Sequence, residues 1–116
     1  MKIGTDIANI SRIEKSIEKF GDKFKEKFLN PIEMVRAKKI ESIAGLWAAK
    51  EAIAKALGCG ICGDLTFHDI TIYKNSRGAP YFELSDTAQL HHKITQSSLS
   101  ISHDSGFAIA VVIINQ

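Results

Sequence analysis

Three charged residues of the types that bind metal ions and phosphates are Asp6, Glu51 and Lys55. Glu51 and Lys55 are four residues apart in a helix-favouring segment, so their side chains share one edge of that helix. Alone, they would form an ordinary surface pair worth about 0.2 to 0.5 kcal/mol. Asp6 adds a second carboxylate, and two carboxylates with water and substrate phosphates are ligands that Mg²⁺ accepts. Lys55 could then hold a phosphate oxygen as a point charge.

The first strand, predicted over residues 2–8, would position Asp6. Its β-branched side chains, Ile3, Thr5 and Ile7, fall on one face. Asp6 lies on the opposite face, between the small residues Gly4 and Ala8. Glu51 and Asp6 would meet if this face packed against the helix that carries Glu51.

That helix is predicted from about Ser42 to Leu57, and glycines after Leu57 end it. One arc is formed by large apolar residues and the opposite arc by small ones, Gly45, Ala48, Ala49, Ala52 and Ala56. A helix that is apolar all round belongs in a core or an interface, and small residues let another backbone approach closely. Lys50 falls inside the large apolar arc, where a charge needs a partner.

A second candidate contact is His103, at the end of the predicted strand segment 98–103 and beside the turn Asp104-Ser105-Gly106. A histidine at a strand end is commonly structural or solvated. As a ligand contact, it would donate a hydrogen bond to a phosphate from a rigid position.

A basic helix face is predicted between the first strand and Gly21. Ser11 and Glu14 are read as a capping box, and Ile10, Ile13, Ile17 and Phe20 as the apolar stripe. Arg12, Lys15 and Lys19 fall together on the other side. Residues 1–60 carry 12 basic against eight acidic side chains, whereas residues 61–116 carry three against five. These three residues form a basic ridge, which is therefore either a solvated face or a docking surface for an acidic partner.

The remaining pattern indicates the α+β class. Asn30, Pro31 and Glu33 open a short helix, Asn75 to Gly78 form a hairpin turn, and Ser85 caps a helix reaching His91. Helices come first and antiparallel strands mostly later. The later strands are predicted at 67–73, 80–84, 99–101 and 107–114.

Composition limits the classes of function. A chain of 116 residues with 45% hydrophobic side chains suits one domain over residues 1–116. No apolar run approaches a membrane span, and no secretory signal is evident, so we expect a soluble cytoplasmic protein. A net charge of +2 is too mild to indicate nucleic acid. Cys59 and Cys62 form one CxxC, the minimal redox or metal signal.

Four segments, in order and spacing, resemble the bacterial holo-acyl-carrier-protein synthase family of 4'-phosphopantetheinyl transferases. They are GTDIANISRI, FLNPIE, AGLWAAKEAIAKALGCGI and SLSISHDSGFAIAVV, and together they extend over nearly the whole chain. The most specific elements are the early G-x-D, the A-x-K-E-A-x-x-K-A-x-G segment and the closing S-x-S-H.

The resemblance implies a small antiparallel sheet packed with a central buried helix, and transfer of phosphopantetheine from coenzyme A to a serine of acyl carrier protein for fatty acid synthesis. It also implies Mg²⁺ held by Asp6 and Glu51 on the coenzyme A diphosphate, with Lys55 stabilising the departing side. His103 and the turn Arg77-Gly78-Ala79-Pro80 correspond to nucleotide contacts. A homotrimer with sites between subunits is implied too, and the first helix would meet the carrier protein.

One departure concerns the coenzyme A contacts. The family usually has arginine and phenylalanine where this chain has Leu46 and Trp47, so we expect Lys50, Arg77 or another subunit to replace one phosphate contact.

Two other functions remain as alternatives: a non-catalytic binding module that uses the first helix, and a small redox protein built on CGIC. Metal binding by this CxxC with His68 or His103 is a further alternative. The redox interpretation is disfavoured because the cysteines follow a helix rather than begin one, where a helix dipole would lower a thiol pKa.

Overall fold

Two antiparallel sheets make up the β structure of this computed structural model, which describes residues 1–116. The larger sheet has the strand order β1-β5-β4, and the smaller one is the hairpin β2-β3. The strands are β1 (Lys2–Asn9), β2 (Ile70–Lys74), β3 (Pro80–Leu84), β4 (Gln96–Asp104) and β5 (Phe107–Asn115). The α+β prediction is therefore confirmed, with the strands divided between two sheets instead of one.

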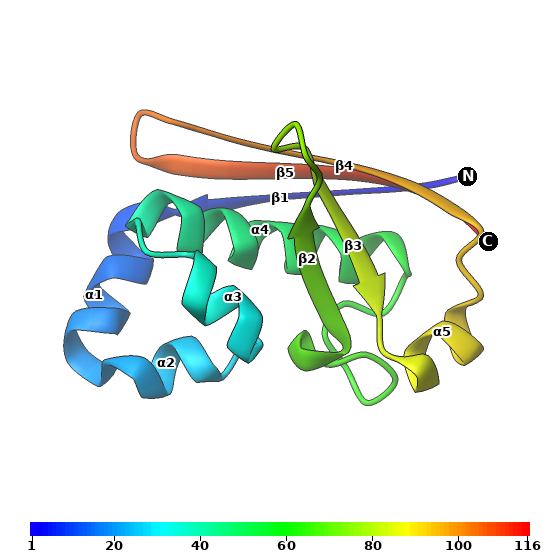
Figure 1. Ribbon diagram of the computed structural model, residues 1–116, viewed down its shortest axis with the longest axis horizontal. Helices are drawn as coiled ribbons and strands as arrows, with labels where there is room; N and C mark the ends of the chain where they lie inside the picture. Colours follow the sequence, from blue (N-terminus) through cyan, green and yellow to red (C-terminus); the bar gives the residue numbers. More distant parts are fainter.

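The central helix α4 (Ile40–Ala56) runs along one face of the larger sheet, and the hairpin crosses it on another side (Figure 1). The small residues of α4 determine how close the sheet comes. A Cβ atom at Gly4 would collide with the carbonyl oxygen of Ala52 and lie 2.9 Å from the Cβ of Ala56. Glycine at position 4 therefore lets β1 lie directly on α4.

This packing decides between the core and the interface, which the sequence left open for the small-residue arc. The small-residue arc was consistent with a subunit interface, but Ala48, Ala49 and Ala52 are fully buried within the chain. The arc is occupied by the chain's own sheet. Both arcs of the helix are largely buried, as predicted.

Three shorter helices lie at one end of α4 (Figure 1): α1 (Ile10–Phe20), α2 (Asp22–Glu26) and α3 (Pro31–Arg36). The predicted capping box of α1 is wrong. Asn9 caps the helix, because its Oδ1 accepts hydrogen bonds from the backbone N–H groups of Ser11 and Arg12. Phe20, assigned to the apolar stripe, is 55% exposed.

The remaining elements differ modestly from expectation. The predicted strand at 67–73 begins as a 3₁₀ turn, η1 (Phe67–Asp69), and β4 is longer at both ends than the predicted 99–101. The helix after Ser85 is α5 (Asp86–His92), with Ser85 as its cap. Side chains from helices and both sheets form one cluster of 24 buried apolar residues.

The outer face of the larger sheet is apolar and exposed. Along β1 and β5, side chains facing away from α4 are 37 to 69% exposed: Ile3, Ile7, Phe107, Ile109, Val111 and Ile113. Alternation along the strands causes this pattern, since the intervening residues pack on α4. None of the helices has both the length and the apolar character needed to cross a membrane.

Candidate active site

Asp6 and Lys55 form the first part of the site. Because Gly4 brings β1 onto α4, the Asp6 side chain reaches the last turn of that helix. The Nζ of Lys55 donates to Oδ1 of Asp6 at 2.8 Å and to the carbonyl oxygen of Thr5 at 3.3 Å. The Lys55 side chain is 52% exposed and that of Asp6 14%, so the pair opens to solvent. The hydrogen bond to Asp6 raises the pKa of Lys55, which keeps the amine cationic.

Glu51 lies near this pair but has no hydrogen-bond or ion-pair partner of its own. Partial burial raises the pKa of Glu51, and the negative charge of Asp6 raises it further, while Lys55 opposes the shift. Lys55 therefore pairs with Asp6 and not with Glu51, contrary to the simple four-residue pair of the isolated helix. The site therefore contains two carboxylates, Asp6 and Glu51, that are close enough to repel each other, and Glu51 has no partner.

This donor set fits Mg²⁺. The repulsion between Asp6 and Glu51 is what a shared cation would relieve, and carboxylate oxygens are the hard ligands that Mg²⁺ prefers. No group of three metal-binding side chains occurs in the chain. A cation held by two protein carboxylates would complete its shell with water and substrate oxygens, as Mg²⁺ commonly does.

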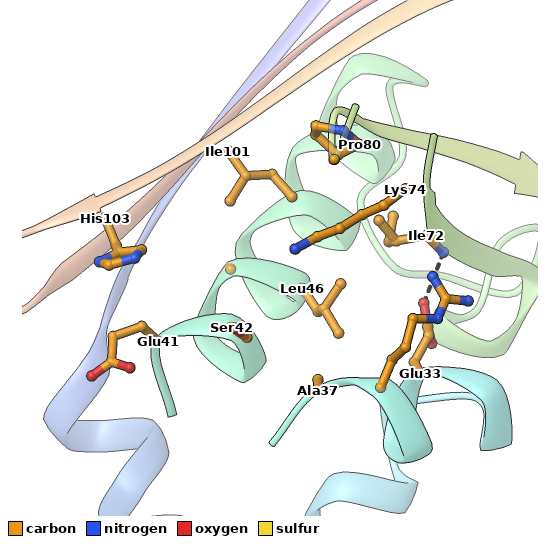
Figure 2. A pocket seen from close by; sticks show the side chains of 13 residues that line it. Glu33, Ala37, Glu41, Ser42, Leu46, Ile72, Lys74, Pro80, Ile101 and His103 are labelled. Carbon is orange, nitrogen blue, oxygen red and sulfur yellow. Dashed lines mark hydrogen bonds between the residues drawn. The ribbon is translucent and has the colours of Figure 1, made fainter. Parts of the chain in front are cut away.

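A cleft of about 310 Å³ between α3, α4, β4 and the hairpin is the second part of the site. Figure 2 shows Leu46 and Ile101 as its apolar lining, with His103 at one end and Pro80 on the hairpin side. Gly78, in the hairpin turn with φ of 83°, also lines it. Three of the predicted nucleotide contacts, Gly78, Pro80 and His103, are thus gathered in one cleft.

Two of the predicted phosphate and nucleotide contacts lie outside this cleft, and two basic residues that were not predicted lie in it. Lys55 and Arg77 are not among the lining residues, whereas Arg36 and Lys74 are. Neither of these two cations has a carboxylate within 4.0 Å. Their sequence signal was weak, since isolated basic residues at a helix end and a strand end are common.

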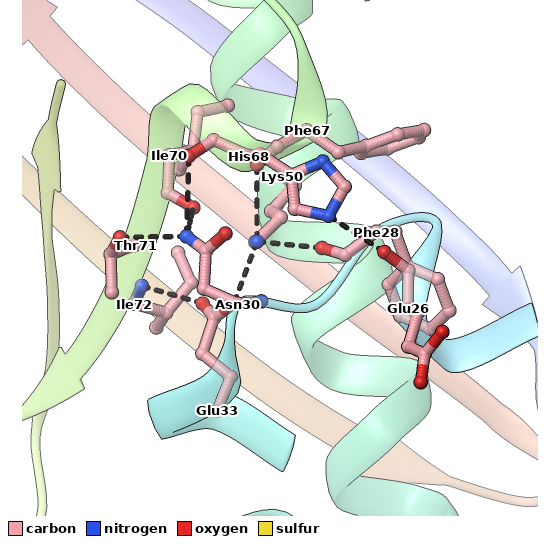
Figure 3. Close-up of polar contacts among 10 residues, drawn as sticks. All are labelled: Glu26, Phe28, Asn30, Glu33, Lys50, Phe67, His68, Ile70, Thr71 and Ile72. Carbon is pink, nitrogen blue, oxygen red and sulfur yellow. Dashed lines mark hydrogen bonds and ion pairs between the residues drawn. The ribbon is translucent and has the colours of Figure 1, made fainter. Parts of the chain in front are cut away.

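Lys50 is excluded as a phosphate contact. Its Nζ is fully buried and donates to the carbonyl oxygens of Phe28 and Phe67, at 2.7 and 3.1 Å, and to Glu33 at 2.7 Å. Figure 3 shows these bonds converging on the amine. The expectation that Lys50 replaces a missing phosphate contact is therefore wrong, because all three of its donors are used internally.

Glu33 extends the same buried network. Oε1 accepts from the backbone N–H of Asn30, and Oε2 accepts from that of Ile72 in β2, at 2.7 and 2.8 Å. The Asn30 amide in turn donates to Ile70 and Thr71 of β2 (Figure 3). This network ties α3 and α4 to the hairpin, and so fixes the walls of the cleft.

The predicted basic ridge of α1 is present. Arg12, Lys15 and Lys19 are exposed, and none of them forms an ion pair within the chain. Lys19 lies over the ring of Phe20, 5.3 Å from its centroid. The ridge is therefore a surface of unpaired positive charge with an exposed aromatic ring at its end.

The cysteine motif supports neither alternative. Cys59 and Cys62 are free thiols, and a hydrogen bond with Cys62 raises the pKa of Cys59 to about 11. A thiol that resists deprotonation is a poor nucleophile. No group of three His, Cys, Asp or Glu side chains is gathered around the two thiols to hold a metal ion. His68, the proposed metal partner, instead contacts the carbonyl oxygen of Glu26 at 2.6 Å.

Comparison with known proteins identifies the family. Residues 2–112 match the ACPS model of the 4'-phosphopantetheinyl transferase superfamily. A holo-[acyl-carrier-protein] synthase from Sulfurovum sp. is 61% identical over 115 residues, which are 99% of this chain and 97% of that protein. The chain belongs to the holo-[acyl-carrier-protein] synthase family. Another member, from Campylobacter jejuni, is 53% identical over 97% of each chain.

Solved structures of holo-[acyl-carrier-protein] synthases share this fold. The Helicobacter pylori enzyme, in complex with coenzyme A, superposes with a TM-score of 0.94 at 49% identity, over 97% of this chain and 99% of that one. The Bacillus anthracis enzyme, in complex with coenzyme A (3',5'-ADP), gives a TM-score of 0.82 at 37% identity, over 97% of this chain and 94% of that one. The α+β architecture inferred from the sequence is thus that of the synthase family.

Proposed function

We propose that this chain transfers the 4'-phosphopantetheine arm of coenzyme A to a serine of apo acyl carrier protein, with Mg²⁺ held by Asp6 and Glu51. The observation that carries this proposal is the pair of adjacent carboxylates, one unpartnered, beside the half-exposed Lys55. Membership of the synthase family over nearly the full length supplies the reaction.

In this reaction the carrier serine oxygen attacks the β-phosphorus of coenzyme A, and the bond from that phosphorus to the bridging oxygen of the diphosphate breaks. Adenosine 3',5'-bisphosphate leaves, and the serine proton passes to water. When bound, Mg²⁺ neutralises charge that develops on the diphosphate oxygens. Asp6 and Glu51 would hold that ion with their carboxylate oxygens. Lys55 holds its cationic amine at the same place and stabilises the departing phosphate, for which its raised pKa suits it.

The cleft is the proposed site of the nucleotide end. Leu46 lies in the cleft wall, and Glu51 follows it by five residues, which places the two about 140° apart around the helix axis. Within a single chain, the cleft and the two carboxylates therefore open on different sides of α4. We accordingly assign the nucleotide to the cleft of one subunit and the diphosphate to the carboxylates of its neighbour.

A homotrimer is the proposed assembly, and the apolar outer face of β1 and β5 supports it. Exposed isoleucine, valine and phenylalanine side chains in one contiguous sheet face are typical of an interface. In a small chain such an interface also supplies the second wall that a nucleotide-sized ligand needs.

Acyl carrier protein is the proposed partner of the α1 ridge. Unpaired Arg12, Lys15 and Lys19 complement an acidic surface and would steer its approach.

Intact mass spectrometry of apo acyl carrier protein incubated with this protein, coenzyme A and magnesium tests the proposal. We expect the carrier to gain about 340 Da, the mass of one phosphopantetheine arm, and EDTA to prevent the gain. A competent carrier that gains no mass, or gains it equally with EDTA, would contradict the proposed function or its metal requirement respectively.

A further inference from the structure

The amine of Lys55 lies directly on one of the two carboxylates assigned to Mg²⁺. Its Nζ donates to Oδ1 of Asp6 at 2.8 Å and to the carbonyl oxygen of Thr5 at 3.3 Å. Asp6 is the one carboxylate within 4.0 Å of this amine. The protein therefore supplies its own cation to the site, and any other cation that binds there must compete with it.

The charges of the three side chains show how strong this competition is. Asp6 and Glu51 contribute two negative charges and Lys55 one positive charge, so the site carries one net negative charge. Glu51 lies one helical turn before Lys55 and interacts with the charges of both other side chains. Because electrostatic attraction scales with the product of the charges, the amine lowers the affinity of the carboxylates for a divalent cation.

A diphosphate would reverse the effect of the amine. The Lys55 side chain is 52% exposed and that of Asp6 14%, so the amine is the more accessible member of the pair. A phosphate oxygen offers the amine a second anionic acceptor, and the flexible four-carbon stem of lysine lets it turn to that acceptor. When the amine pairs with the diphosphate, it no longer neutralises Asp6, and both carboxylates can hold a metal ion.

We propose that Lys55 is an internal counter-ion of the metal site, which makes Asp6 and Glu51 bind Mg²⁺ weakly alone and tightly together with the diphosphate of coenzyme A. This proposal rests on the proposed function for the identity of the metal and of the ligand. Lys55 thereby supplies part of the coupling free energy between the two ligands. By reciprocity, each ligand raises the affinity for the other by the same factor.

Calorimetric titration of the full chain with MgCl₂, with and without saturating coenzyme A and in the absence of carrier, tests the proposal. A titration of coenzyme A without protein corrects for binding in solution. The ratio of the two dissociation constants is the coupling factor. Lys55→Met should tighten Mg²⁺ binding without coenzyme A about fivefold, the effect of one half-exposed charge, and leave it within about twofold with coenzyme A. The coupling factor should therefore fall about fivefold.

Two further variants separate the position of the charge from the total charge. Lys55→Arg keeps a cation beside Asp6 and should bind Mg²⁺ as weakly as the wild type. Lys39→Met removes the same charge at the other end of α4, where the lysine side chain makes no capping hydrogen bond, and is the matched control. Lys55→Gln provides a second neutral variant if Lys55→Met fails to fold.

The outcomes distinguish this proposal from the proposed function. Mg²⁺ binding that Lys55→Met leaves unchanged or weakens, or an equal gain in Lys39→Met, would overturn the role of Lys55. An undiminished coupling factor in Lys55→Met would overturn it too. A wild type that shows the Lys55-dependent coupling yet transfers no phosphopantetheine to a competent carrier would retain this proposal and contradict the proposed function instead.

Discussion

Two ion pairs on the same helix, five residues apart, have almost the same length and opposite roles. Lys50 lies 2.7 Å from Glu33, and Lys55 lies 2.8 Å from Asp6. The first pair is fully buried, and every donor of its amine has an acceptor within the chain. The second is half-exposed, and a neighbouring carboxylate, Glu51, has no partner.

The two ion pairs differ in how many of their hydrogen-bonding groups remain free to bind a ligand. A buried, saturated pair has no donor left for a ligand, so it can only hold elements in place. An exposed pair beside an unpartnered acid can bind a metal and a phosphate without first breaking the fold. Residue type and spacing are therefore insufficient to separate a structural lysine from a catalytic one, and burial decides.

Removing the buried amine should have the largest effect on stability. Lys50→Met leaves the Glu33 carboxylate uncompensated in the core, and we expect it to lower the free energy of unfolding by about 3 to 5 kcal/mol. Urea denaturation at one protein concentration measures this. Adding Glu33→Gln to Lys50→Met should restore part of the loss. A loss under about 1 kcal/mol would show that the two ion pairs do not differ as described.

Removing the exposed amine should have the converse effect. Lys55→Met should change the free energy of unfolding by no more than about 1 kcal/mol, because a solvent-exposed pair contributes little. Its kcat should fall about a hundredfold, the effect of losing one group that stabilises developing charge. Steady-state transfer assays and urea denaturation of one preparation give both numbers. A stable variant with wild-type kcat would remove Lys55 from the reaction.

The ridge of α1 provides a third test, because its charges are neither buried nor paired. Reversing Arg12, Lys15 and Lys19 to glutamate should raise the KM for acyl carrier protein about tenfold and weaken its dependence on salt, with kcat nearly unchanged. Lys93→Glu, at the end of α5 away from the ridge, is the control. An unchanged KM would place carrier docking on another surface.

A smaller effect is expected at Asp69, whose carboxylate is saturated by neutral donors. It accepts from the Thr66 N–H and the Ser85 hydroxyl at 2.8 and 2.7 Å, and the Thr66 bond lowers its pKa. The ionised Asp69 carboxylate therefore contributes its full stabilisation of the fold above about pH 4, the usual pKa of an aspartate. This contribution is lost as pH falls through the lowered pKa. Asp69→Asn should cost about 1 kcal/mol at pH 7 and progressively less as pH falls through that lowered pKa. A cost that does not change with pH, measured by denaturation beside Asp64→Asn, would contradict this.

The sequence predicted most of the elements and the placement of Asp6. Alternation over residues 2–8 predicted that Asp6 shares a strand face with Gly4 and Ala8, and in the structure this face meets α4. The helix cap was misassigned because Asn9 and Ser11 both have suitable side chains, and only the chain direction after β1 selects Asn9.

The partners of the lysines could not be predicted. Lys50 meets acceptors 17 and 22 residues away, which local spacing does not reveal. The cleft cations Arg36 and Lys74 were missed for the same reason, since α3 and the hairpin become neighbours only through the Asn30 and Glu33 network. The small-residue arc was recognised, but periodicity does not say whether a sheet or a subunit covers it.

The assignment of Asp6 and Glu51 as the magnesium ligands is tested most directly by Glu51→Gln, assayed for transfer by intact mass and for unfolding by urea denaturation. A neutral amide is a poor ligand for Mg²⁺ but similar in shape, and the wild-type carboxylate has no partner to lose. We therefore expect turnover to disappear while the free energy of unfolding stays the same or rises. Full magnesium-dependent activity in a folded Glu51→Gln variant would contradict the assignment.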